Sequence, residues 1–143
     1  MLLLDVNVVF YAHRAEFPQH IMAKEWLQST LASGEPFAAP GHVLASVVRL
    51  ATNHRWMRPP STMDQVLDFC GQITRAPGWL DLAPGRRHWE IFDRLSRDTN
   101  ATGDLVPDAF LAALAIENDC ELVSFDRGFR RFPGLRFSPP TSP

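Results

Sequence analysis

The chain has 143 residues, of which 45% are apolar and 21% charged. This length suits one domain, since two separate cores would each bury too little apolar surface, and the composition excludes a largely disordered chain. The net charge of −2 argues against binding of polyanions by bulk attraction alone. The sequence also lacks an apolar stretch of the roughly 20 residues that a membrane-spanning helix needs, and it lacks the basic start of a secretory signal. We therefore expect a soluble, cytoplasmic, single-domain protein over residues 1–143, with two buried thiols and no membrane partner.

Arginine supplies nearly all of the positive charge, because Lys24 is the only lysine among 14 basic residues. The planar guanidinium group pairs well with phosphate, and it is equally common as a solvated surface group or as a partner of acids. The candidates for phosphate contacts are Arg49, Arg55, Arg127 and Arg130. Of the four tryptophans, those at 26, 79 and 89 fall in apolar periodic segments and are expected in the core. Trp56 lies in an irregular segment and is a candidate for stacking on a base.

The hydropathy pattern predicts strands that alternate with helices. Short apolar runs at 1–4, 37–39, 79–82, 121–125 and 135–137 are typical of buried or edge strands. Helical spacing of apolar residues occurs at 19–31, 43–51, 66–73 and 84–97, and again after Pro107, which suits the first turn of a helix. Residues 53–60 are expected to be irregular and residues 138–143 to form a flexible tail. The alternation predicts an α/β sandwich with a mainly parallel central sheet.

Acidic residues stand where a parallel sheet gathers its ligands, at the carboxyl ends of strands. Asp5 and Asp126 directly follow two predicted strands, and Asp108 lies in the first turn of a helix, with Asp104 four residues before it. Each alone suits a turn or a helix start. Together they indicate a site for a hard divalent cation, Mg²⁺ or Mn²⁺, because such ions take oxygen ligands.

Three fragments of the sequence resemble the signature regions of PIN-domain ribonucleases, specifically toxins of the VapC type. The fragments are Leu4–Val8, Asp108–Ala115 and Ser124–Phe129, which read LDVNV, DAFLAALA and SFDRGF. The resemblance implies a three-layer α/β/α fold and Mg²⁺-dependent hydrolysis of RNA by a metal-activated water. It also implies a cognate antitoxin protein as partner and a homodimer. By position, the implied catalytic and metal-binding acids are Asp5, Asp108 and Asp126, and the implied supporting residues are Asn7 and Ser124.

The sequence departs from the family pattern at Ser46, where most relatives carry a glutamate. Asp104 is the available replacement as a metal ligand, although it can equally serve as a helix cap. One alternative function is therefore a PIN-like domain that binds RNA or a protein but has impaired catalysis. A second alternative, phosphoryl transfer through an aspartyl-phosphate, is disfavoured because Lys24 lies in an early helix and Asn7 stands where such phosphatases usually carry a second aspartate.

Overall fold

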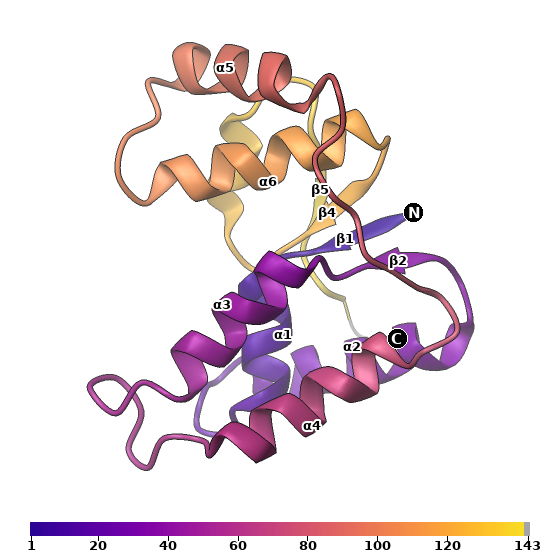
Figure 1. Cartoon of the computed structure of the whole chain (residues 1–143), viewed down its shortest axis with the longest axis vertical. Coiled ribbons are helices and arrows are strands. Elements are labelled where there is room, and N and C mark those ends of the chain that lie inside the picture. The colour runs from indigo at the N-terminus through magenta and orange to yellow at the C-terminus, as the bar shows by residue number, and fades with distance from the viewer. Residues whose placement is uncertain (142–143) are drawn as a thin grey trace.

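A five-stranded parallel sheet forms the centre of the computed structural model, which describes residues 1–141 (Figure 1). The strands lie in the order β3-β2-β1-β4-β5, and every neighbouring pair is parallel. They are β1 (Leu2–Leu4), β2 (Phe37–Ala38), β3 (Trp79–Leu80), β4 (Glu121–Val123) and β5 (Arg136–Ser138). The central strand β1 pairs with β4 so that Leu4 lies opposite Val123. The segments that leave these two strands therefore start side by side.

Helices cover both faces of this sheet. They are α1 (Val6–His13), α2 (His20–Ser33), α3 (Gly41–Ala51), α4 (Met63–Thr74), α5 (His88–Thr99) and α6 (Leu105–Glu117), with a 3₁₀ helix η1 (Arg127–Arg131) after β4. In Figure 1, α5 and α6 lie on one side of the sheet, and α1, α2, α3 and α4 lie on the other. The predicted α/β/α sandwich with a parallel sheet is confirmed.

Side chains alternate between two cores, one on each face of the sheet. Leu3, Ala38 and Leu122 are fully buried against α5 and α6. Their neighbours Leu4, Phe37 and Val123 are buried in the core formed with α1, α2, α3 and α4. Because both faces are covered, the strands read as continuous apolar runs, and this is why they could be predicted from the sequence.

Helix α1 is the element that the hydropathy pattern does not predict. Residues 6–13 are rich in β-branched and aromatic side chains, which have low intrinsic helix propensity and look like a continuation of the strand. Tertiary packing overrides this preference, because Val8, Val9, Phe10 and Ala12 are all buried in one core. Asp5 starts the helix as its N-cap by accepting a hydrogen bond from the backbone N–H of Val6.

Two further expectations need correction. Trp89 is 70% exposed, not part of the core, while Ile91 and Leu95 supply the buried face of α5. The predicted tail begins too early, because Ser138 is the last residue of β5 and pairs with Val123. Residues 142 and 143 of that segment lie outside the described residues, and the flexibility of the remainder stays a prediction.

Other expectations agree with the structure. Residues 53–60 contain turns and bends but no helix or strand. Cys70 and Cys120 are both buried free thiols. Over residues 1–141, no helix has the length and apolar character needed to cross a membrane.

Candidate active site

Three carboxylates from three separate segments line one hollow at the carboxyl edge of the sheet. Asp5 follows β1, Asp126 follows β4 after two intervening residues, and Asp108 lies in the first turn of α6. The hollow has a volume of about 420 Å³. Asn7, Tyr11, Ser46, Arg49 and Pro107 also contribute to its wall. The strand order thus brings together acids that are up to 121 positions apart in the sequence.

The Asp5 carboxylate is buried and firmly held, with only 7% of the residue exposed. Its Oδ1 accepts a hydrogen bond from the backbone N–H of Val6 at 2.7 Å, and its Oδ2 accepts one from the Ser124 hydroxyl at 2.6 Å. Each carboxylate oxygen has a second lone pair. Asp5 can therefore be fixed by the protein and still offer an oxygen to a cation.

Ser124 is fully buried and connects the end of β4 to α1. Its hydroxyl donates to Asp5 and accepts hydrogen bonds from the Asn7 side-chain amide and from the backbone N–H of Asp126, each at 2.9 Å. This uses the single donor and both acceptor sites of a hydroxyl. Asn7 also accepts a hydrogen bond from the backbone N–H of Phe125 at 3.1 Å. These hydrogen bonds of Asn7 and Ser124 connect the Asp5 carboxylate to the backbone of Asp126.

A tight turn after β4 orients Asp126. Its Oδ1 accepts a hydrogen bond from the backbone N–H of Gly128 at 2.7 Å, at the start of η1. A Cβ atom at position 128 would lie 2.9 Å from that same oxygen and 3.1 Å from Nη2 of Arg131. The absence of a side chain at Gly128 therefore lets the backbone approach the carboxylate closely.

Burial, together with repulsion between the carboxylates, raises the pKa of Asp5 and of Asp108. Burial raises the pKa of Asp108 to about 6, with further increases from the charges of Asp5 and Asp126 and a decrease from Arg131. Burial also raises the pKa of Asp5, with the hydrogen bond from Ser124 acting in the opposite direction. Within residues 1–141 the Asp108 carboxylate has no hydrogen-bond partner. A cation in the hollow would relieve the repulsion.

The donor chemistry of the hollow fits a hard divalent cation that keeps part of its water shell. Its polar wall consists of carboxylate, amide and hydroxyl oxygens together with one guanidinium group, without histidine or cysteine. No group of three or more His, Cys, Asp or Glu side chains in residues 1–141 is placed so that it could hold a metal ion by itself. Mg²⁺ does not need such a cage, because it binds through one or two carboxylates and completes its shell with waters and substrate phosphates.

Ser46, on α3, lies in the wall of the same hollow as Asp5. Its hydroxyl donates to the carbonyl of His42, one turn earlier in the helix, at 2.9 Å. A serine here adds no negative charge, so the hollow has one carboxylate fewer than it would with glutamate at this position.

Of the other predicted site residues, one lies in the wall of the hollow and four lie outside it. Arg49 lines it, whereas Arg55, Arg127 and Arg130 are exposed and do not. Asp104 is exposed at the N-cap position of α6 and is not part of the wall, and its side chain makes no capping hydrogen bond. Its charge still contributes to the raised pKa of Asp108.

The sequence reasoning missed two residues of the site. Tyr11 lines the hollow one helical turn after Asn7, and recognising α1 would have placed both on one helix face. Arg131 is the cation whose charge lowers the pKa of Asp108. It was one arginine among several in the sequence, and no local signal distinguished it from Arg127 and Arg130.

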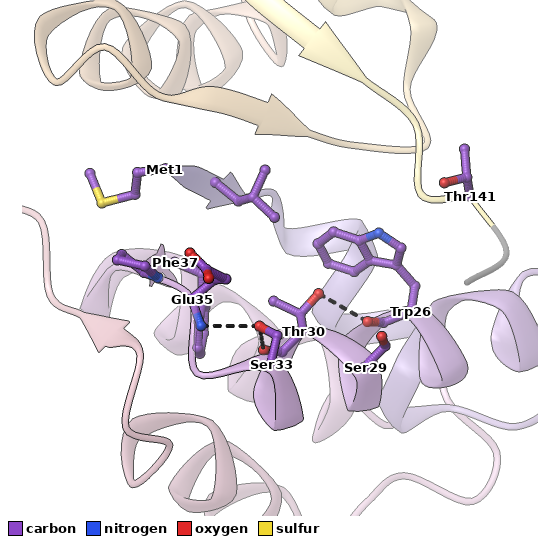
Figure 2. Close-up of a pocket in the computed structure, with 10 residues that line it drawn as sticks. Met1, Trp26, Ser29, Thr30, Ser33, Glu35, Phe37 and Thr141 are labelled. Atoms are coloured by element: carbon purple, nitrogen blue, oxygen red, sulfur yellow. Dashed lines mark hydrogen bonds between the residues drawn. The ribbon is translucent and has the colours of Figure 1, made fainter.

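A second hollow lies near the start of β1, beside α2, and lacks the chemistry of the first (Figure 2). Its volume is about 480 Å³, and Met1, Trp26, Thr30 and Ser33 are among the residues that line it. Glu35 is its single acid. The Thr30 and Ser33 hydroxyls donate to backbone carbonyls of α2, so the polar groups of this wall are largely satisfied internally.

An α/β/α sandwich with carboxylates gathered at the carboxyl edge of a parallel sheet defines a class of proteins that bind their ligands at that edge. Within it, the chain belongs to the PIN-domain family, whose model matches residues 2–135.

Curated relatives agree over nearly the full length. Ribonuclease VapC31 of Mycobacterium tuberculosis is 42% identical over 136 residues, which is 95% of this chain and 96% of that protein. Ribonuclease VapC25 of the same organism is 40% identical over the same shares. Ribonuclease VapC43 is 39% identical over 98% of this chain and 95% of its own length. The family predicted from the three signature fragments is therefore confirmed.

Solved structures share the fold at low sequence identity. A chain of the VapBC2 complex from Rickettsia felis, bound to a DNA fragment from its promoter, matches with a TM-score of 0.67 and 17% identity, covering 96% of this chain and 97% of that one. VapC20 of Mycobacterium tuberculosis, described as a toxin that cleaves the sarcin-ricin loop, matches with a TM-score of 0.66 and 14% identity over 95% and 99% of the two chains.

Proposed function

We propose that the protein is a divalent-cation-dependent endoribonuclease that hydrolyses RNA phosphodiester bonds. The observation that carries this proposal is the convergence of Asp5, Asp108 and Asp126 on one hollow, with the pKa of Asp108 raised to about 6. RNA is the substrate class favoured by the curated relatives, which are named ribonucleases.

Carboxylates among Asp5, Asp108 and Asp126 would hold Mg²⁺ or Mn²⁺, with waters and substrate phosphate oxygens completing the shell of the ion. When bound, such an ion lowers the pKa of a water ligand and neutralises charge that develops on the phosphate. Ser124 and Asn7 keep Asp5 in position through the hydrogen bonds described above. Arg49, at the wall of the hollow, would hold a phosphate oxygen of the bound strand. Asp104 lies outside the wall and adds negative charge that attracts the cation.

A second candidate function, an RNA- or partner-binding domain with impaired catalysis, rests on Ser46. The hollow contains a hydroxyl where the family resemblance implies a carboxylate, so it attracts a cation less strongly. Both functions predict RNA binding, and only the first predicts cleavage.

The decisive experiment measures cleavage of total RNA by the purified protein during a Mg²⁺ titration and after addition of EDTA. We expect Mg²⁺-dependent cleavage that Asp5→Asn abolishes, because a neutral amide is a poor ligand for a hard cation. Asp68→Asn, at an exposed acid of α4, is the matched control and should cleave normally. Undiminished Mg²⁺-dependent cleavage by Asp5→Asn would contradict the assignment. RNA binding without cleavage would favour the second function.

We further propose that the protein is a cytoplasmic toxin that forms a homodimer and is inhibited by a cognate antitoxin. The family resemblance supports this, and so do the apolar side chains that α2 and α4 expose, Ile21 and Met22 on the first helix and Met63 and Leu67 on the second. An antitoxin arginine placed among the carboxylates of the hollow would block cation binding.

Overproduction of the protein alone should arrest growth. Harmless overproduction of a protein that cleaves RNA in vitro would contradict the toxin role.

A further inference from the structure

The loop that joins α3 to α4, residues 52–62, presents an exposed indole between two arginines. Trp56 is 74% exposed. Arg55 and Arg58, on either side of it in sequence, are exposed as well. Tryptophan is enriched at contact surfaces, because the indole offers a large apolar face to a partner.

The loop is anchored, so the indole is held in place by ordered backbone. The carbonyl of Asn53 accepts hydrogen bonds from the N–H groups of Trp56 and Met57 at 3.1 and 2.9 Å. The Met57 side chain is buried in the core. At the far end of the loop, the largely buried Arg14 donates to the carbonyl of Pro59 at 2.8 Å. The order of the loop reduces the entropy lost when a ligand stacks on Trp56.

Charge along the loop favours an anion, and Glu16, which lines the same pocket as Arg58, is ion-paired with Arg14. Residues 36–63 contain three arginines, Arg49, Arg55 and Arg58, and no acidic residue, although the whole chain has a net charge of −2. In the described part of the chain, none of these three arginines forms an ion pair, whereas Arg14, Arg97 and Arg136 do. The free guanidinium groups are therefore available to phosphates.

This positive segment is continuous with the acidic hollow. Arg49 lines the hollow, and α3 ends at Ala51, about 3 Å further along the helix axis. In Figure 1 the loop lies at the end of α3 that points away from the sheet, on the opposite side of the molecule from α5. A strand bound in the hollow can thus continue along the end of α3 onto the loop.

We propose that the α3–α4 loop is a docking platform for single-stranded RNA, on which Trp56 stacks against a base outside the cleaved bond while Arg55 and Arg58 contact the flanking phosphates. This inference rests on the proposed function, since it assigns the binding site for the same substrate. The aromatic ring between two cations matches the general mode of single-strand recognition, in which stacking tolerates any base and arginines follow the backbone. A protein partner is less suited, because three unpaired arginines would need an acidic surface in addition to an apolar one.

The test measures the affinity of the full-length protein for a fluorescein-labelled single-stranded RNA of about 12 nucleotides. Fluorescence anisotropy in EDTA reports binding without cleavage, and a salt series separates stacking from charge. We expect Trp56→Ala to weaken binding by at least about fivefold without changing the slope of affinity against salt. Trp56→Phe should retain most of the affinity. Arg58→Ala should reduce that slope by about 0.7.

Trp89→Ala is the matched control, because Trp89 is 70% exposed but lies on α5. If Trp56→Ala binds RNA as tightly as the parent, or loses no more affinity than Trp89→Ala, the platform does not exist. If Trp56→Ala instead weakens only the binding of a purified antitoxin, the loop is a protein interface and the proposal is overturned. If the protein binds RNA through Trp56 but does not cleave it, the proposed function is wrong and the docking platform is still supported.

Discussion

Asp108 provides a test of the acidic hollow that does not depend on activity. Replacing it with asparagine removes one negative charge from beside Asp5 and Asp126 and breaks no hydrogen bond among the described residues. If the raised pKa of Asp108 reflects burial and repulsion, the Asp108→Asn protein should be more stable than the parent when no cation is present.

The magnitude follows from linkage between protonation and folding. The pKa of Asp108 is raised from 3.8 to about 6 on folding. The folded protein therefore holds more protons between these pH values, and the destabilising contribution of Asp108 grows as the pH rises through this window and is complete above pH 6. A difference of about 2 in pKa corresponds to about 3 kcal/mol of unfolding free energy. Because Asp108 is only half-buried, solvent screens this effect, and we expect about 1–2 kcal/mol.

Urea denaturation in EDTA at pH 7.5 and pH 4 measures the difference directly. At pH 7.5 the variant should be more stable by about 1–2 kcal/mol, and at pH 4 the two proteins should be nearly equal. Added Mg²⁺ should stabilise the parent more than the variant, because the cation binds to the folded acids. Asp68→Asn should change little at either pH. A loss of stability in Asp108→Asn at pH 7.5, or a gain that does not depend on pH, would refute the reasoning.

Three other predictions concern the groups around the acids. Ser46→Glu should tighten Mg²⁺ binding in calorimetric titrations, since it restores a carboxylate to the wall of the hollow, and unchanged affinity would show that position 46 does not reach the cation. Asp104→Asn should weaken Mg²⁺ binding less than Asp126→Asn does, because Asp104 lies outside the wall; equal losses would make it a direct ligand. Ser124→Ala should reduce the unfolding free energy by about 1–3 kcal/mol and impair cleavage, because it removes one hydrogen-bond partner from each of Asp5 and Asn7. An active Ser124→Ala protein with parental stability would contradict the positioning role.

The sheet and the acids could be predicted because local sequence encodes them. Buried parallel strands are continuous apolar runs, and Asp5 stands directly after such a run. Asp108 follows Pro107 at the start of a helix, so its position was also visible locally. These signals, with the family resemblance, were enough to place the acidic residues at one edge of the fold.

What could not be predicted depends on contacts between distant segments. The apolar residues of α1 have weak helix propensity, and only packing against the rest of the core makes them helical. The family resemblance pointed to Ser124, but its hydrogen bonds to Asn7 and Asp5, 117 and 119 positions away, are visible only in the folded chain. The exposure of Trp89 likewise depends on how α5 rotates against α6, because helical periodicity alone allowed it to face inward.

Cleavage in ¹⁸O-labelled water with Mg²⁺ tests most directly the claim that the acidic hollow supports hydrolysis of RNA. If water is the nucleophile, the newly formed phosphate ends carry one ¹⁸O atom, no 2′,3′-cyclic phosphate accumulates, and EDTA stops the reaction. Mass spectrometry of the cleavage products gives the answer in one experiment. Cyclic phosphate ends without ¹⁸O, or cleavage that persists in EDTA, would mean that the 2′-hydroxyl is the nucleophile or that the carboxylates hold no catalytic cation.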